Sequence, residues 1–437
     1  MSRPNKRGGR PMLTLCPVCF EQVEGQYVGP DDAVSLSAVC PKHGGWQTPV
    51  WIGSPTFDSW GAESTCGCCG GAAGGTAKTC TAVLEVTHRC NLSCPVCFAD
   101  STSASPFVDP PADDLLLALQ ELIDDQGPVN LQFSGGEPTL RQDLDVLIGG
   151  ARKMGFTFIQ VNTNGLRLAS EPEYAAALRA AGLESVFLQF DGLNEDVYRA
   201  LRGRPLLAEK LRAIANCETA GLGVVLVPTV LAGVNSDQLG SLARFAAERN
   251  PTVRGLHLQP ISHFGRYPAS ARLGLTLPQV LNLLEEQTHG EVCGDHFRPS
   301  ACEHARCSFR ARYRVCADDR LELFASDKSH NSQQGDPARR AIAATSRQWS
   351  RPFPQDGSDA SDSLGRFLAD TRRILSISGM MFQDAWNIDL ARIDRCCVHS
   401  LVPGRGLIPF CLWNLTSASG QRLFPRSLRL TGTDLPG

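Results

Sequence analysis

The chain has 437 residues, a length that corresponds to roughly two to four domains. Lysine and arginine total 42, aspartate and glutamate total 45, and the formal net charge is −3. This balance gives no reason to expect nucleic acid or an anionic membrane as a partner. No apolar run of about 18 residues occurs, and no apolar segment follows the basic residues 1–10. We therefore expect no transmembrane segment, no secretion signal and a cytoplasmic location.

The chain contains 18 cysteines. A chain of this size without a secretion signal does not need disulfides to stabilise its core. Closely spaced cysteines in such a protein favour metal sites.

Residues 1–13 are basic and polar, and we expect a disordered leader there. Residues 14–65 are predicted to form a small metal-binding module of the rubredoxin or zinc-ribbon kind. Its candidate ligands are Cys16, Cys19, Cys40 and His43, in a C-x2-C-x20-C-x2-H pattern. Four such ligands fit tetrahedral coordination of one Zn²⁺ or Fe ion. A structural role is the default interpretation, and a rubredoxin-like electron relay is the alternative.

Residues 66–80 form a Cys- and Gly-rich connector. Cys66, Cys69 and Cys80 are candidate ligands of an auxiliary cluster. Backbone N–H groups of the glycine-rich segment could point at the sulfides of that cluster. The alternative interpretation is a redox-active dithiol at the neighbouring Cys68 and Cys69.

Residues 81–262 alternate short apolar segments with amphipathic ones, a pattern that predicts parallel strands joined by helices. Six such units are too few for a full eight-unit barrel, so we expect an open, partial (βα)6 barrel of the α/β class. Its chemistry should lie at the carboxyl ends of the strands. The expected strands are 82–87, 129–133, 157–161, 185–190, 223–230 and 255–259.

Directly after the first strand, Cys90, Cys94 and Cys97 have the spacing C-x3-C-x2-C. Three thiolates can bind three irons of a [4Fe–4S] cluster and leave the fourth iron open, as reactive metal sites require. A zinc knuckle and an electron-transfer cluster are the alternatives. After the second strand, Gly135 and Gly136 allow close approach of a ligand to the backbone, and Glu137 can bind an ammonium group.

On these residues the chain resembles the radical S-adenosylmethionine (SAM) superfamily over roughly residues 81–262. The resemblance implies that the open iron chelates SAM and that reductive cleavage yields a 5′-deoxyadenosyl radical. It implies cluster ligation by Cys90, Cys94 and Cys97, and places Phe98 as the aromatic residue that follows them. It also implies that the turn at residues 135–137 holds the methionine amino group of SAM.

Four polar residues end later strands and are candidates for hydrogen bonds to the ribose hydroxyls or carboxylate of SAM: Asn162, Asn164, Gln189 and Asp191. The alternative is ordinary turn chemistry, because Asn-Gly and Asp-Gly favour tight turns. Arg202 could meet a carboxylate, but a solvated arginine at a helix end is the favoured interpretation. His257 and Gln259 are candidates to line the pocket, and a buried core histidine is the favoured interpretation of His257.

Residues 263–437 are predicted to form a cysteine-containing extension with a disordered insertion near 326–364. We expect at least one auxiliary Fe–S cluster there, and its candidate ligands are Cys302, Cys307, Cys396, Cys397 and Cys411. The full set of motifs is similar to the multi-cluster branch that includes tetraether lipid synthase and the methanopterin-type radical SAM methylases. The string at residues 66–71 is also similar to the radical SAM (seleno)protein TrsS group.

The sequence thus predicts a radical SAM enzyme that modifies an unactivated C–H position by methylation or C–C coupling. A multi-cluster electron-transfer protein and a zinc-ribbon interaction protein are the alternatives. The expected partners are a small-molecule, lipid or peptide substrate and an electron donor such as ferredoxin or flavodoxin. No catalytic acid or base stands out by spacing.

Overall fold

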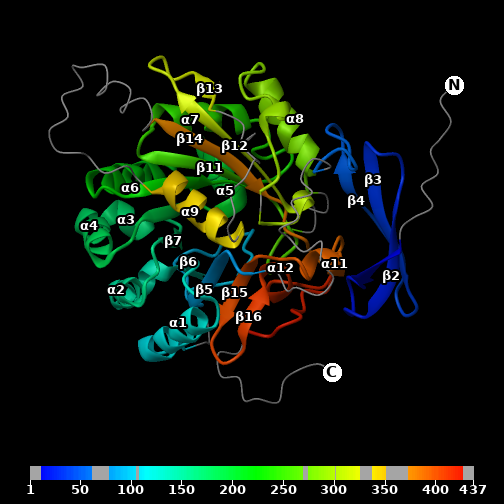
Figure 1. The fold of residues 1–437 in the computed structure, drawn as a ribbon, viewed down its shortest axis with the longest axis horizontal. Helices are drawn as coiled ribbons and strands as arrows, with labels where there is room; N and C mark the ends of the chain where they lie inside the picture. Colours follow the sequence, from blue (N-terminus) through cyan, green and yellow to red (C-terminus); the bar gives the residue numbers. More distant parts are fainter. Residues whose placement is uncertain are drawn as a thin grey trace.

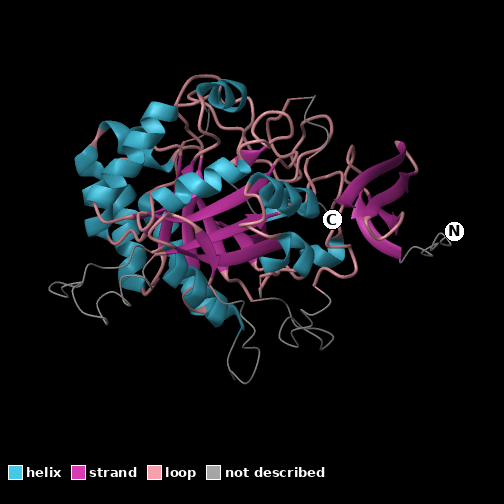
Figure 2. Cartoon of the chain, turned by 90° about the horizontal axis from the view of Figure 1, so that it is seen from above, coloured by secondary structure: helices cyan, strands magenta, loops and turns pink. Residues whose placement is uncertain are grey.

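The computed structural model shows a large mixed sheet with a small separate sheet at its side (Figure 1). Figure 2 shows helices gathered around the strands of the large sheet. None of the helices described is long and apolar enough to cross a membrane. The structure describes residues 11–61, 78–104, 108–268, 274–300, 302–324, 337–350 and 373–426.

The small sheet is the N-terminal module. Its four strands are antiparallel in the order β1-β2-β3-β4. They are β1 (Pro11–Leu15), β2 (Gln22–Val28), β3 (Ala33–Cys40) and β4 (Gly44–Ile52). Residues 11–13 were expected to belong to a disordered leader. They are instead part of β1 and pair with residues 24–26 of β2. The rest of the expected leader, residues 1–10, lies outside the described residues.

The centre of the large sheet is the predicted six-stranded partial barrel. Each strand is parallel to the next, in the order β5-β6-β7-β8-β9-β11. The strands are β5 (Thr81–Thr87), β6 (Asn130–Gly135), β7 (Ile159–Thr163), β8 (Ser185–Gln189), β9 (Gly223–Val227) and β11 (Val253–Pro260). Between β9 and β11, the two-residue β10 (Thr229–Val230) pairs with the end of β11.

The helices between these strands bury one apolar stripe each against the sheet. In α2, Leu144, Leu147, Ile148 and Ala151 are buried at helical spacing, and Gly155 ends the helix in the left-handed conformation. The helices are α1 (Ala112–Gln126), α2 (Leu144–Met154), α3 (Leu166–Ser170), α4 (Pro172–Ala181), α5 (Glu195–Arg202), α6 (Leu207–Thr219), α7 (Leu239–Glu248) and α8 (Leu277–Gln287).

The C-terminal extension adds one parallel strand to each edge of the six-stranded core. Strand β14 (Ile374–Met380) pairs with β11, and β15 (Val398–Val402) pairs with β5. Antiparallel strands continue the sheet outside these two, namely β12 (Ser308–Val315), β13 (Leu321–Leu323) and β16 (Gly406–Pro409). The short elements are η2 (Pro138–Leu140), η3 (Gly294–His296), η4 (Ala305–Cys307), α11 (Leu390–Ile393) and α12 (Phe410–Trp413).

Helix α9 (Pro337–Trp349) differs from the sequence prediction, because it lies within the expected disordered insertion at 326–364. Its alanines favour a helix, and its contacts fix it in place. Ala338 packs against a buried cysteine cluster, and Trp349 packs against Phe187 and His257. Most of the remaining insertion lies outside the described residues.

The two faces of the parallel strands have different chemistry. In β7, Ile159 and Val161 belong to the main apolar core under the helices, so Gln160 and Asn162 project from the other face. The same alternation in β11 places His257 on that inner face, where Trp349 of α9 meets it. The inner face of the barrel is therefore partly polar and is covered by α9.

Candidate active site and metal centres

The three cysteines after β5 lie at the carboxyl end of that strand, as predicted. Cys90 and Cys94 are buried and Cys97 is half-buried. Burial raises the pKa of Cys90 to about 12. Cys97 and Cys94 add to this rise through their own charges, so the three thiols lie near one another.

Gly135 and Gly136 lie against the backbone of the cysteine loop. A Cβ added at Gly135 would lie 2.2 Å from the Thr87 oxygen, and one at Gly136 would lie 2.2 Å from the Arg89 oxygen. The Gly136 N–H donates to Thr87 O at 2.7 Å, and the Glu137 N–H donates to Arg89 O at 2.8 Å. Glycine is therefore required at both positions because the backbone of the cysteine loop packs directly against them. This is a different reason from the expected close approach of a ligand.

The buried Glu137 carboxylate is held by four donors of the chain. Its Oε1 accepts from the Thr139 N–H at 3.1 Å, the Thr139 hydroxyl at 2.6 Å and the Thr163 hydroxyl at 2.7 Å. Its Oε2 accepts from the Asn164 N–H at 2.7 Å. Glu137 thus ties the glycine turn to the end of β7, a structural role that the sequence analysis did not foresee.

The polar strand ends surround a buried lysine that sequence analysis missed. Lys210 of α6 is fully buried, and its Nζ donates to the Asn164 carbonyl and, at 3.2 Å, to Gln189 Oε1. The Asn164 side chain donates to Asn91 Oδ1 in the cysteine loop at 2.7 Å. Burial lowers the pKa of Lys210 to about 8. Its position in an amphipathic helix resembles that of a surface lysine, so the sequence held no signal for it.

Arg202 corrects one expectation, and its partner is Asp191. Both side chains are buried, and Asp191 accepts two hydrogen bonds from Arg202, at 2.6 and 2.7 Å. Arg202 also donates to the Val96 carbonyl at 3.0 Å, inside the cysteine loop. Arg202 is therefore not solvated. Asp191 is paired with a protein cation, and its contact with SAM stays a prediction.

Phe98 lies beside the C-terminal extension. Its ring centroid is 5.9 Å from that of Phe410, the neighbour of Cys411, and its carbonyl accepts from Arg422 at 2.8 Å. Cys97 forms a two-way backbone bridge with Arg266, at 2.8 and 2.9 Å. The cysteine loop is thus held by segments from beyond residue 262.

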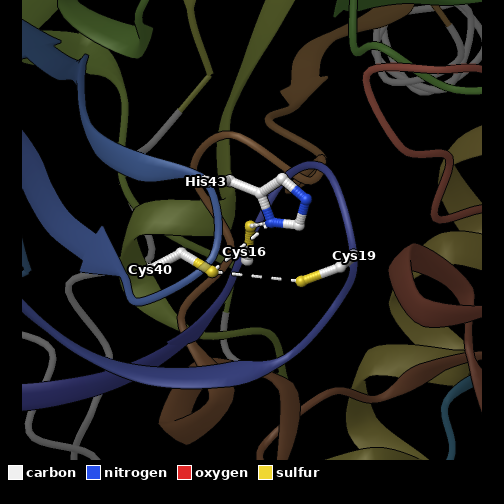
Figure 3. A group of neighbouring side chains, drawn as sticks. All are labelled: Cys16, Cys19, Cys40 and His43. Carbon is white, nitrogen blue, oxygen red and sulfur yellow. Dashed lines mark hydrogen bonds between the residues drawn. The ribbon is translucent and has the colours of Figure 1, made fainter.

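The N-terminal module brings its four predicted ligands together (Figure 3). His43 Nδ1 lies 3.6 Å from Cys16 Sγ and 3.5 Å from Cys40 Sγ, and Cys19 Sγ lies 4.0 Å from Cys40 Sγ. Tetrahedral coordination of one Zn²⁺ requires about 3.6 Å for nitrogen–sulfur and about 3.8 Å for sulfur–sulfur pairs. The observed distances fit one metal ion.

Six further cysteines form two groups of three. The sulfur atoms of Cys80, Cys302 and Cys397 all lie within 4.8 Å of one another. The second group is Cys307, Cys396 and Cys411. In addition to burial, Cys307 and Cys396 raise the pKa of Cys411, and Cys307 raises the pKa of Cys396. Each close pair in the sequence is therefore divided, because Cys302 and Cys307 go to different groups and so do Cys396 and Cys397. The proposed ligands Cys66 and Cys69 lie outside the described residues.

Cys80 and Cys397 meet because they precede neighbouring parallel strands. Thr81 of β5 is in register with Val398 of β15, and the Cys80 N–H donates to the Cys397 carbonyl at 2.9 Å. Their sulfur atoms are 3.0 Å apart. The group therefore lies at the amino ends of the strands, opposite the Cys90 loop at a carboxyl end.

Comparisons with known proteins agree with this geometry. Residues 84–246 match the radical SAM superfamily, and residues 10–52 match the HMPTM N-terminal zinc ribbon domain. The 7,8-dihydro-6-hydroxymethylpterin dimethyltransferase of Methanocaldococcus jannaschii is 30% identical over 479 aligned residues, which cover 92% of each chain. The chain belongs to this radical SAM methylase branch.

Other relatives match only part of the molecule. The GTP 3′,8-cyclase of Campylobacter curvus is 33% identical over 50% of this chain and 66% of its own. The crystal structure of Streptococcus suis SuiB bound to the precursor peptide SuiA has a TM-score of 0.40 and 18% identity, over 49% of this chain and 46% of its own.

As a radical SAM enzyme, the chain uses a [4Fe–4S] cluster and SAM. Its zinc ribbon fits the metal ion of the N-terminal module, and the group of Cys80, Cys302 and Cys397 fits an auxiliary cluster. The alternatives of a pure electron carrier and of an interaction protein are thereby set aside.

Proposed function

We propose that this enzyme methylates an unactivated carbon of a small planar heterocycle, with a reduced pterin as the first candidate. The relative that aligns with 92% of the chain is named for dimethylation of 7,8-dihydro-6-hydroxymethylpterin. C–C coupling is the second candidate, supported by the shorter match to GTP 3′,8-cyclase. The length of the first alignment favours methylation.

The cysteine loop supplies the donor set for the radical SAM cluster. We assign its ligation to Cys90, Cys94 and Cys97, three thiols gathered after β5. When bound, the cluster and SAM supply a 5′-deoxyadenosyl radical for hydrogen abstraction. The chain's contribution is position, since Glu137 joins the glycine turn to β7 and Arg202 ties the loop to Asp191.

The inner face of the barrel supports a substrate with amide-like edges. Asn162 donates to Gln132 at 3.3 Å, Gln132 to Gln160 at 2.9 Å and Gln160 to Ser185 at 3.0 Å. Asn162 Oδ1 is buried and has no hydrogen-bond partner among the described residues. A buried acceptor of this kind is costly unless a ligand donor reaches it.

Aromatic rings border the same face. The Phe187 ring lies 5.3 Å from His257 and 5.7 Å from Trp349, between ring centroids. His257 is held by Ser378 at 2.9 Å, and burial lowers its pKa to about 4. A neutral imidazole and two aromatic rings offer flat surfaces to a planar ring.

The auxiliary cysteine groups are proposed to hold Fe–S clusters, and a ferredoxin- or flavodoxin-like protein is proposed as the electron donor. Cys411 follows Phe410, whose ring contacts Phe98 of the cysteine loop. This contact supports the proposal of a second auxiliary cluster near the radical SAM loop. An electron could pass between the two sites over that short path.

The decisive experiment supplies the anaerobically reconstituted enzyme with SAM and a strong reductant. We expect 5′-deoxyadenosine from the wild-type enzyme and none from Cys94→Ala. Adding 7,8-dihydro-6-hydroxymethylpterin should give a product heavier by one or two methyl groups in mass spectrometry. Equal 5′-deoxyadenosine yields from both proteins would refute the radical assignment, and an unmodified pterin would refute the substrate assignment.

A further inference from the structure

A cavity of about 240 Å³ lies between the zinc ribbon and the large sheet. Residues 48–52 of the ribbon form one wall, and residues 260–263 and 381–387 form another. The last two segments follow directly after β11 and β14. The cavity is therefore at the carboxyl ends of parallel strands, where barrel enzymes of this class carry out their chemistry.

The cavity is connected to the radical SAM loop by one short segment. Ile261 and His263 line the cavity, and three residues after His263, Arg266 forms the backbone bridge with Cys97. The Arg266 side chain also donates to the Cys94 carbonyl at 2.7 Å. A ligand held in the cavity is thus adjacent to the backbone that positions the reactive site.

Two arginines on the cavity wall have donors without acceptors. The Nε atoms of Arg306 and Arg392 are both buried, and neither has a hydrogen-bond partner among the described residues. Arg392 donates through Nη2 to Cys307 Sγ at 3.1 Å and to the Arg306 carbonyl at 3.3 Å. Because both Nε atoms have almost no accessible surface, a ligand in the cavity would meet the terminal nitrogens, and those of Arg306 hydrogen-bond no described residue.

The carboxylates near these arginines are bonded to other groups. Asp384 accepts from the His263 backbone at 2.8 Å and from its ring at 2.6 Å. Asp389 accepts from the Tyr27 hydroxyl at 2.8 Å and caps α11. Asp389 also accepts from the Arg392 backbone N–H at 3.4 Å and attracts both guanidinium groups electrostatically, but it hydrogen-bonds neither of them. Two cations therefore line the cavity.

The remaining wall is aromatic. Arg306 lies 3.5 Å from the centre of the Phe57 ring, which itself lies 5.8 Å from Trp51. Phe382 and Trp386 line the opposite wall. Such a cavity suits a ligand with a flat apolar body and an anionic end.

We propose that this cavity binds an aromatic oxyanion, a carboxylate or a phosphate ester, through Arg306 and Arg392. If the substrate is the pterin of the proposed function, this oxyanion is a group carried on the pterin side chain, because 7,8-dihydro-6-hydroxymethylpterin itself has no anionic end. The cavity would hold that charged end beside the radical SAM loop. This proposal rests on the proposed function, because it identifies the ligand of the cavity as the substrate of the enzyme. The zinc ribbon has a matching role, because residues 48–52 and Phe57 complete the wall.

The test measures binding to the full-length, metal-loaded protein by titration calorimetry without SAM or reductant. The probes are phenyl phosphate and benzoate, with neutral benzyl alcohol as the comparison. We expect at least one anion to bind more tightly than benzyl alcohol, and the tighter anion identifies the oxyanion class. Arg306→Met should weaken that binding by about 10-fold or more, because it removes a charged hydrogen bond.

Arg320→Met is the matched control, since Arg320 is exposed and paired with Asp318 outside the cavity. It should bind the anion as the wild-type protein does. Arg306→Lys keeps the charge and should fall between wild type and Arg306→Met, which separates loss of binding from loss of folding. Failure of both anions to bind, or equal binding by Arg306→Met and wild type, overturns the proposal.

This measurement is independent of catalysis. A failure to bind anions leaves SAM cleavage and pterin methylation open to their own test. Conversely, an absence of 5′-deoxyadenosine does not affect the calorimetric result. The two proposals can therefore fail separately.

Discussion

Arg202 and Asp191 form a two-bond ion pair beneath the radical SAM loop, with 4% of one side chain and none of the other exposed to solvent. Arg202 also hydrogen-bonds the Val96 carbonyl and favours the thiolate of Cys94. Burial raises the pKa of Cys94, and the charge of Arg202 opposes that rise. The pair thus holds the loop in place and favours the thiolate form of Cys94, a proposed cluster ligand.

Replacing Arg202 with Met should destabilise the protein by about 3–5 kcal/mol, because it leaves a buried carboxylate without its partner. Urea unfolding of the reconstituted protein under anaerobic conditions measures the change. The control Arg199→Met removes an exposed arginine of the same helix and should change stability by less than about 1 kcal/mol.

The double variant Asp191→Asn with Arg202→Met should recover part of the loss, because no uncompensated charge remains. Additive losses in the double variant would contradict a coupled pair.

The division of Cys80 and the five C-terminal cysteines into two groups predicts an unusual pattern of iron loss. Cys302→Ser and Cys307→Ser should each remove the metal of a different group. The double variant of Cys302 and Cys397 should lose no more iron than Cys302→Ser alone, whereas the double variant of Cys302 and Cys307 should lose the sum. Iron analysis after reconstitution measures both.

Cys217→Ala serves as the control for this series, because Cys217 is buried in the apolar core under α6. It should retain the full iron content. Equal losses in both double variants would mean that the six cysteines form one site.

Removing a ligand from the zinc ribbon should cost one metal ion per chain. Cys40→Ser takes away a buried thiol whose pKa is lowered to about 6, since burial raises it but backbone and His43 hydrogen bonds lower it more. Elemental analysis should show the loss of one Zn or one Fe and thereby identify the ion. The visible absorbance of the Fe–S clusters should remain.

Lys42→Ala is the neighbouring control, because that side chain is 67% exposed. It should keep the ion. A Cys40→Ser protein with an unchanged metal content would rule out the four-ligand site.

The buried Lys210 should make stability depend on pH. Burial lowers its pKa from 10.5 to about 8 in the native state. Between these values the unfolded chain binds more protons, so native stability rises with pH in that window. Relative to Lys210→Met, the wild-type protein should gain about 2 kcal/mol between pH 7 and pH 9.5.

Urea unfolding at both pH values measures the gain. Lys153→Met replaces an exposed lysine and should show the same pH dependence as wild type. The free energy of unfolding should rise more between the two pH values in the wild-type protein than in Lys210→Met. An equal or smaller rise would contradict a charged, buried Lys210 at neutral pH.

The order of residues along the chain was enough to predict much of the fold and several site residues. The six core strands, the helices between them, the loop of Cys90, Cys94 and Cys97, and the four ligands of the ribbon follow from period and spacing over a few residues. Such features need only neighbours in the sequence, because strand alternation and short ligand loops are local. The helix at 337–349 was missed because its polar surroundings outweighed its alanines.

The tertiary structure alone decided which distant residues meet. Register between β5 and β15 joins Cys80 to Cys397, 317 residues apart, and divides two close cysteine pairs between two groups. Burial made Arg202, which was expected to be solvated, and Lys210, which the sequence did not single out, supports of the site. These outcomes depend on sheet pairing and desolvation, which arise only when segments far apart in the chain are packed together.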